Sequence, residues 1–160
     1  MKPVSGTISL SCAATLIAKN ERTLRRWLND GQLTPIANDH NGRMMVNFDD
    51  IKQLICVSLE PEDYRLIEDA DSGNAQAQND LALLFLAGGK QKSAVYWLQM
   101  AAKNDYPDAM HWLSRCYMDG IGLEKDDNQG VIWLSKAAMH GHSIAQEQMR
   151  RLFGNTRPPA

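Results

Sequence analysis

The chain has 160 residues, which is enough for one domain of ordinary size or for two small ones. Hydrophobic residues make up 44% of the sequence and charged residues 22%, the balance of a soluble globular protein, and no run of about 18 apolar residues is present that would span a membrane. The net charge of −2 divides unevenly, with seven basic against five acidic residues up to Val57 and ten against fourteen after it. A mildly basic N-terminal part followed by an acidic remainder indicates two modules with different partners.

The cysteines and the N-terminus bear on the cellular location. Cys12, Cys56 and Cys116 are odd in number and lie in apolar helical patterns, so we expect reduced thiols in the core. The stretch Met1–Ser9 is short and polar and does not have the apolar segment of a secretory signal. A cytoplasmic protein is the expectation.

Two short helices joined by a turn are predicted between Ser9 and Asp30. Ser9 is a suitable N-cap for a first helix that runs to about Ile17, and Asn20 can cap the second. Gly31 follows the second helix in the way that a C-terminal glycine ends a helix.

The second helix has two different faces. Leu24, Trp27 and Leu28 are spaced to bury one face against a core. The opposite face gathers the polar side chains Arg22, Arg25, Arg26 and Asn29. Such a helix fits the major groove of double-stranded DNA, where Arg binds guanine or phosphate and Asn binds adenine. The alternative is a solvated arginine-rich face, which is common in globular proteins.

The next segment predicts a two-stranded wing and a closing helix. Residues 33–36 and 44–46 have strand character, and Asn41-Gly42 between them is a hairpin signal that leaves Arg43 at the tip of the wing. Asp49 is expected to cap a third helix over residues 50–57.

This arrangement resembles the MerR/excisionase-like winged helix-turn-helix family over about residues 7–57. The likeness is carried by the helix start over Ser9–Ala14, by the run from Arg22 to Leu33, by Arg43, and by Phe48-Asp49-Asp50-Ile51. Cys12 and Lys19 depart from the usual pattern, and the wing has a single arginine. The resemblance implies that Trp27 belongs to the core. The expected DNA contacts are Lys19, Arg22, Arg25, Arg26, Asn29 and Arg43.

The second half of the chain repeats itself. Ala77, Ala109 and Ala145 begin equivalent units of 32 and 36 residues, and Trp97-Leu98 returns as Trp133-Leu134. Small alanines let paired helices approach closely, so the pattern predicts a tandem helix-turn-helix array.

The array is similar to the Sel-one-like repeats, which are relatives of the tetratricopeptide repeats, over about residues 73–153. The third unit has only one helix and is expected to act as a cap, while a helix over residues 61–70 is expected to stack on the first repeat and hold the two modules together. In that family a concave surface binds another protein or peptide. The candidate partner-binding residues are Tyr96, His111, Trp112 and Arg115; the alternative for each of them is packing between the repeats.

The predicted fold is therefore mainly α, with an N-terminal winged helix-turn-helix and an α-solenoid of about two and a half repeats. The predicted domains are a DNA-binding domain over 1–58, an acidic connector over 59–72, a repeat domain over 73–155 and a disordered tail over 156–160. Self-association, if it occurs, is expected to run through the repeats, because no long heptad follows the wing.

Two further motifs do not support a site. Gly88-Gly89-Lys90 resembles part of a phosphate-binding loop, but Leu84 and Gln91 occupy positions that need Gly and Ser or Thr. His140 and His142 have no further ligands at metal-binding spacing beyond Cys116. We expect no metal, no cofactor and no catalytic residues. The leading hypothesis is a bacterial DNA-binding transcriptional regulator or accessory factor with a protein partner; the alternative is a non-enzymatic adaptor whose winged module does not bind DNA.

Overall fold

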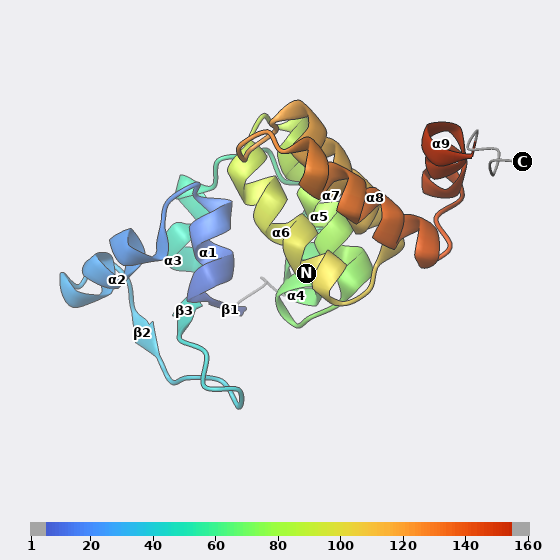
Figure 1. Cartoon of the computed structure of the whole chain (residues 1–160). Helices are drawn as coiled ribbons and strands as arrows, with labels where there is room; N and C mark the ends of the chain where they lie inside the picture. Colours follow the sequence, from blue (N-terminus) through green and yellow to red (C-terminus); the bar gives the residue numbers. More distant parts are fainter. Residues whose placement is uncertain (1–5, 155–160) are drawn as a thin grey trace, which may run out of the picture.

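The computed structural model describes residues 6–154, which form nine α-helices, one 3-10 helix and a small three-stranded sheet (Figure 1). The first part, residues 6–57, is called the N-terminal module, and helices α4–α9 are called the repeat array. The elements of the N-terminal module are β1 (Thr7–Ser9), α1 (Leu10–Leu16), α2 (Glu21–Asn29), β2 (Pro35–Ile36), β3 (Met45–Asn47), α3 (Phe48–Ile51) and η1 (Lys52–Leu54). Those of the array are α4 (Pro61–Asp71), α5 (Ala75–Ala87), α6 (Gln91–Lys103), α7 (Pro107–Asp119), α8 (Asp127–Met139) and α9 (Ser143–Phe153).

The first two helices begin where the sequence predicts. The Ser9 hydroxyl accepts a hydrogen bond from the Cys12 amide at 3.1 Å, and the Asn20 side chain accepts one from the Thr23 amide at 2.8 Å. Both caps satisfy amides that the first helical turn leaves without a backbone partner. Gly31, with φ of +75°, follows the end of α2 in the left-handed conformation that glycine adopts without strain.

The sheet has one more strand than the predicted wing. The hairpin of β2 and β3 is confirmed, with Ile36 opposite Met45, but β1 adds a third antiparallel strand in the order β1-β3-β2, with Ile8 opposite Val46. The two-stranded expectation was wrong because β1 is only three residues long and has no sequence signal apart from its pairing with β3.

The closing helix is shorter than predicted. The cap is the Asn47 side chain, which accepts a hydrogen bond from the Asp49 amide at 2.9 Å, so the assignment of Asp49 as the cap was wrong. The helix ends at Ile51 and η1 at Leu54, short of the expected Val57. After Leu54 the backbone becomes extended, and the Cys56 amide donates a hydrogen bond to the Leu16 carbonyl oxygen at 2.9 Å instead of continuing the helix.

The repeat array is built from two layers, with α5, α7 and α9 in one layer and α4, α6 and α8 in the other, so that each helix packs on the next (Figure 1). The helix predicted over residues 61–70 is α4. The three alanines that begin the units, Ala77, Ala109 and Ala145, are all buried. In the second repeat the Ser114 hydroxyl donates to the Gly130 carbonyl oxygen at 2.7 Å, and a Cβ at Gly130 would lie 2.5 Å from Met118 Cγ. Small residues therefore set the close approach of α7 and α8.

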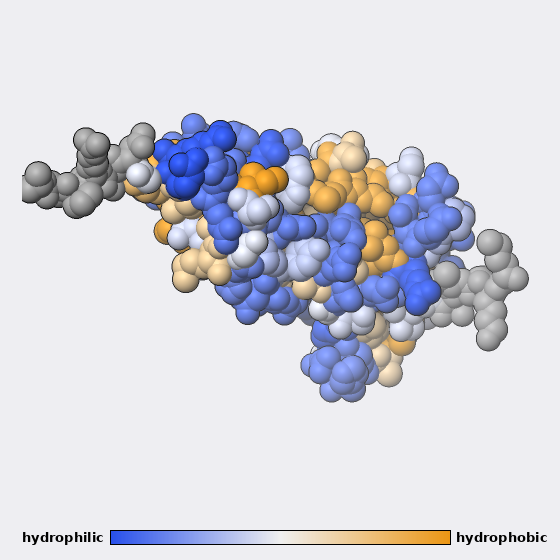
Figure 2. Space-filling model, turned by 90° about the vertical axis from the view of Figure 1, so that its right-hand side faces the viewer, coloured by the Kyte–Doolittle hydropathy of each residue, from blue (hydrophilic) through white to orange (hydrophobic). Residues whose placement is uncertain are grey.

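The third unit has one helix, as expected for a cap. The position that is Ala82 in α5 and Ser114 in α7 is Arg150 in α9, and its guanidinium forms two hydrogen bonds of 2.8 Å with Glu147. Where the first two repeats have a small residue, α9 thus has a long charged side chain. Figure 2 views this side of the molecule, where hydrophilic residues cover most of the surface and separate smaller hydrophobic patches. The last helix of the array, α9, also exposes three large hydrophobic side chains, Ile144, Leu152 and Phe153.

The N-terminal module and the repeat array share one hydrophobic core, which runs from Ile8 to Ala145. At the junction Ser93 of α6 donates to the Thr15 carbonyl oxygen at 2.8 Å, and the indole of Trp97 donates to the Thr15 hydroxyl at 2.9 Å. A Cβ at Gly88 would lie 2.7 Å from Val57 Cγ1, so the last residue of the N-terminal module also packs tightly on the array. These contacts fit the prediction that the two parts are held together.

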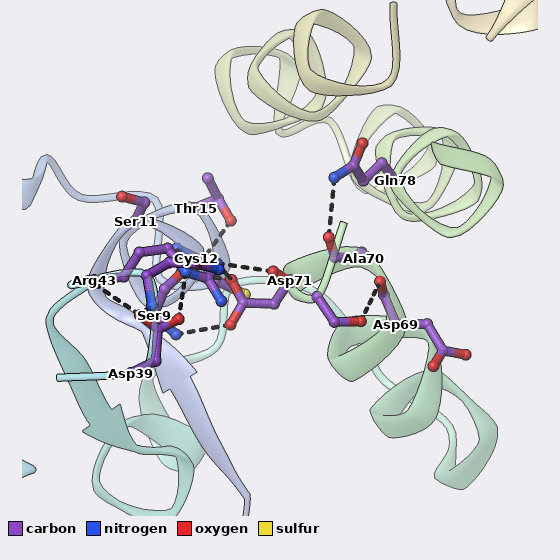
Figure 3. Close-up of polar contacts among 12 residues, drawn as sticks. Ser9, Ser11, Cys12, Thr15, Asp39, Arg43, Asp69, Ala70, Asp71 and Gln78 are labelled. Carbon is purple, nitrogen blue, oxygen red and sulfur yellow. Dashed lines mark hydrogen bonds and ion pairs between the residues drawn. The ribbon is translucent and has the colours of Figure 1, made fainter. Parts of the chain in front are cut away.

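A second contact between the two parts centres on Asp71, the last residue of α4 (Figure 3). Its carboxylate accepts hydrogen bonds from the Ser9 amide at 2.8 Å, from the Ser9 hydroxyl at 2.5 Å and from Arg43 Nη1 at 3.2 Å. Arg43 Nη1 also donates to the Asp71 carbonyl oxygen at 2.8 Å. The Asp71 side chain is only 8% exposed. We call this set of contacts the Asp71 anchor.

The Asp71 anchor predicts a large loss of stability in Asp71→Ala. Removing the carboxylate leaves the Ser9 amide and the Ser9 hydroxyl without this acceptor and takes one of three acceptors from Arg43, which we expect to lower the free energy of unfolding by about 2–4 kcal/mol. Urea unfolding followed by circular dichroism measures this. The exposed neighbour Asp69 is the control, and Asp69→Ala is expected to cost less than about 0.5 kcal/mol. Equal losses in the two variants would contradict the role of Asp71.

Candidate functional site

The arginine face of α2 is exposed, as the helical spacing predicts. Arg22, Arg25, Arg26 and Asn29 all lie at the surface, whereas Leu24 on the opposite side is buried. Arg25 forms an ion pair of 3.5 Å with Glu21 within the helix. Trp27 is only partly buried against the core, so its assignment as a core residue holds in part.

The other two predicted DNA contacts lie elsewhere. Arg43 does not project from the wing as a free cation, because Nε donates to Asp39 at 2.7 Å and Nη1 is bound to Asp71. This corrects the expectation that Arg43 is free to reach DNA, because its side chain, which is 40% exposed, pairs with Asp39 and with Asp71 at the end of α4. Lys19 is exposed on the turn between α1 and α2 and faces the repeat array.

A groove that the sequence did not reveal lies between this turn and the start of α6. We call it the junction groove, and its volume is about 720 Å³. Its charged and aromatic lining residues are Lys19, Glu21, Lys90, Lys92 and Tyr96. The local sequence signal for this groove was Gly89-Lys90, which lines it. These two residues belong to the Gly88-Gly89-Lys90 motif, which by its sequence is an incomplete phosphate-binding loop. A smaller groove of about 530 Å³ runs between α2 and the hairpin, with Arg25 and Asn29 beside Leu28, Ile36 and Met44.

The predicted partner-binding residues fall at two places. Tyr96 lines the junction groove, where its ring meets Trp97 edge to face at 5.1 Å and where burial raises the pKa of its phenol. His111, Trp112 and Arg115 lie together on α7. The Arg115 guanidinium lies over the Trp112 ring at 4.9 Å, with Arg115 exposed and Trp112 half-buried.

His111 contacts the capping helix rather than open solvent. Its ring stacks on His142 with 4.3 Å between centroids, and its Nε2 lies 3.0 Å from the Gln148 side-chain oxygen of α9. His142 in turn caps α9, since its Nδ1 accepts a hydrogen bond from the Ala145 amide at 3.1 Å. Burial lowers the pKa of His111 from its usual 6.5, and the charges of His142 and Arg115 act in the same direction, whereas Gln148 and Asp108 oppose the shift.

No group of three or more His, Cys, Asp or Glu side chains within residues 6–154 is arranged to hold a metal ion. Cys116 is buried, and this burial raises the pKa of its thiol to about 11. Among the same residues, none of the helices combines the length and hydrophobicity needed to cross a bilayer.

Comparison with known proteins identifies the repeats. A family model described as Sel1 repeat matches residues 75–106 and 107–142. A solved structure described as a Sel1 repeat protein from Oxalobacter formigenes is similar over 59% of this chain and 29% of that chain, with a TM-score of 0.55 and 32% identity. Residues 75–142 are therefore two Sel1 repeats, a type of repeat that generally binds protein partners.

Curated relatives share the repeat region. "DAP3-binding cell death enhancer 1" from Rattus norvegicus is 33% identical over 101 residues, which cover 59% of this chain and 20% of the relative. "Wolframin" from Drosophila melanogaster is 33% identical over 94 residues, which cover 52% of this chain and 11% of the relative. The matched regions are thus a fifth or less of the length of these relatives.

The His111 contacts predict that the protein is less stable in mild acid. Because the folded chain holds the pKa of His111 below 6.5, the unfolded chain binds more protons there, and the free energy of unfolding falls as the pH drops below 6.5. We expect urea unfolding midpoints to be lower at a pH about one unit below 6.5 than one unit above it. His111→Gln, which cannot titrate, is expected to reduce this difference. An undiminished pH dependence in His111→Gln would show that another group causes it.

Proposed function

We propose that this protein is an adaptor that binds a protein partner on the α5–α7–α9 layer of its repeat array. The observation that carries the proposal is the position of Trp112 and Arg115 on the central helix of that layer. Tryptophan and arginine contribute more than other residues to binding energy at protein interfaces, and here the guanidinium is already stacked on the indole.

The packing of the N-terminal module supports this choice of surface. The module contacts the other layer, with α1 on α6 and β1 on α4. In the layer of α5, α7 and α9 the module reaches the end of α5, where Val57 packs at Gly88, and the proposed surface on α7 lies away from these contacts. The name of the rat relative states that it binds DAP3, which supports partner binding as a use of such repeats without indicating the partner of this chain.

The proposal includes no enzymatic activity, and it places the adaptor in the cytoplasm. Support for the location comes from Cys12, Cys56 and Cys116, which are all free thiols. Burial raises the pKa of each thiol, so all three are held in the neutral, unreactive form.

DNA binding by α2 is a second candidate function. It is favoured by one observation, the exposure of Arg22, Arg25, Arg26 and Asn29 on a single face of a capped helix. Arg43 is bound within the chain, so this face would contact DNA without help from the wing. A bacterial regulator that couples DNA to a partner on the array would use both surfaces.

The adaptor proposal predicts that Trp112→Ala with Arg115→Ala loses its partner. We expect recovery of the partner from lysate of the native host to fall about tenfold or more, as for the removal of an interface hot spot. Affinity capture on the immobilised full chain with quantitative mass spectrometry measures this. The control is Trp133→Ala with Lys136→Ala, a pair of the same kind on α8, where Lys136 Nζ lies 4.3 Å from the ring centre.

Loss of the same proteins in both double variants would indicate general unfolding, which thermal melts of each variant would reveal. Retention of every captured protein by a folded Trp112→Ala, Arg115→Ala variant would refute the proposed surface.

The second candidate predicts that a gel shift with fragments of host DNA depends on Arg25 and Arg26. We expect affinity to fall steeply between about 50 and 200 mM salt, because each neutralised phosphate releases counterions. Arg25→Glu with Arg26→Glu is expected to abolish the shift, whereas Arg150→Glu with Arg151→Glu, which changes charge by the same amount on α9, is expected to leave it. No shift by the wild-type protein at the lowest salt would exclude DNA binding by α2.

A further inference from the structure

The junction groove is formed by both parts of the molecule. One wall comes from α1 and the turn that follows it, including Ala14, Ala18 and Lys19, and the other comes from the start of α6. Its volume of about 720 Å³ falls within the range of small-molecule sites, which often lie between domains. None of the contacts that support the proposed function uses this space.

The charged groups of the junction groove favour an anion. Lys19, Lys90 and Lys92 line it, and none of the three forms an ion pair with a carboxylate in the described part of the chain. The acid in the lining is Glu21, whose carboxylate already accepts a hydrogen bond from Ser11 at 2.5 Å and pairs with Arg25. The groove is therefore left with three available cations.

The start of α6 adds donors to the lysines. Lys90 is the N-cap and has no side-chain acceptor for the first-turn amides, which belong to Gln91, Lys92 and Ser93. All three residues line the groove. First-turn amides have no partner within the helix, and they lie at the positive end of the helix dipole. The residues that carry these amides and the three lysines therefore line the same groove.

The walls are held in place, and part of the lining is apolar. Gln91 accepts a hydrogen bond from the Gly122 amide at 3.2 Å, and a Cβ at Gly122 would lie 2.5 Å from the Gln91 carbonyl oxygen, so the loop after α7 fixes this end of α6. Ser93 donates a hydrogen bond to the Thr15 carbonyl oxygen across the junction. Tyr96, Ala14 and Ala18 provide the apolar surface that an organic ligand needs.

We propose that the junction groove binds a small organic molecule that carries a phosphate group. Three ammonium groups beside helix-start amides suit a multiply charged oxyanion better than a single carboxylate. Since the ligand would contact both α1 and α6, its binding also strengthens the attachment of the N-terminal module to the array.

The test is a titration of the ¹⁵N-labelled full chain followed by amide chemical shifts, with pyrophosphate and then glucose 6-phosphate as probes. We expect saturable shifts at Gln91, Lys92 and Ser93 and on the turn at Lys19. In Lys90→Gln with Lys92→Gln, the dissociation constant should rise about tenfold or more. The control is Lys103→Gln with Lys136→Gln, two lysines outside the groove, and it should bind as the wild type does.

Three outcomes would overturn the proposal. Shifts that do not saturate, and that sodium chloride reproduces at equal ionic strength, would show simple screening. Equal weakening in the two double lysine variants would show nonspecific charge attraction. Succinate binding as tightly as pyrophosphate would overturn the assignment to phosphate. Each variant is checked by its thermal midpoint without ligand, so loss of fold is distinguished from loss of the site.

Discussion

The attachment of the N-terminal module depends on a carboxylate at an unfavourable position. Asp71 ends α4, and a negative charge at a helix C-terminus is repelled by the helix dipole. The structure compensates with the Ser9 amide, the Ser9 hydroxyl and the Arg43 guanidinium, which all donate to this carboxylate. Ser9 also caps α1. The Asp71 side chain therefore joins the first strand, the first helix and the hairpin to the repeat array.

This attachment determines how the surfaces of the protein relate to one another. The arginine face of α2 and the Trp112–Arg115 pair of α7 belong to one body with a continuous core, so a partner on one surface is held at a fixed orientation to a partner on the other. The junction groove lies along the seam between the two parts. A ligand there is therefore in a position to affect the seam without competing for either surface.

Small residues allow the close packing of helices in the repeat array. Ala82 is fully buried in α5, and at the same position of α7 Ser114 donates a hydrogen bond to Gly130 of the facing helix α8. At Arg150 the same position holds a long charged side chain bound to Glu147. The outer surface of α9 carries these charges together with the exposed side chains of Ile144, Leu152 and Phe153.

The sequence alone determined the features that depend on neighbours a few residues apart. The caps at Ser9 and Asn20, the exposed arginines of α2 and the repeat period all follow from helical spacing and from hydrogen bonds within one turn. The tertiary structure decided what depends on distant partners. Arg43 is bound to Asp71, 28 residues away, and Tyr96 lies in the junction groove, apart from Trp112. A local pattern shows which side chains leave a helix, but packing between elements decides which group each one meets.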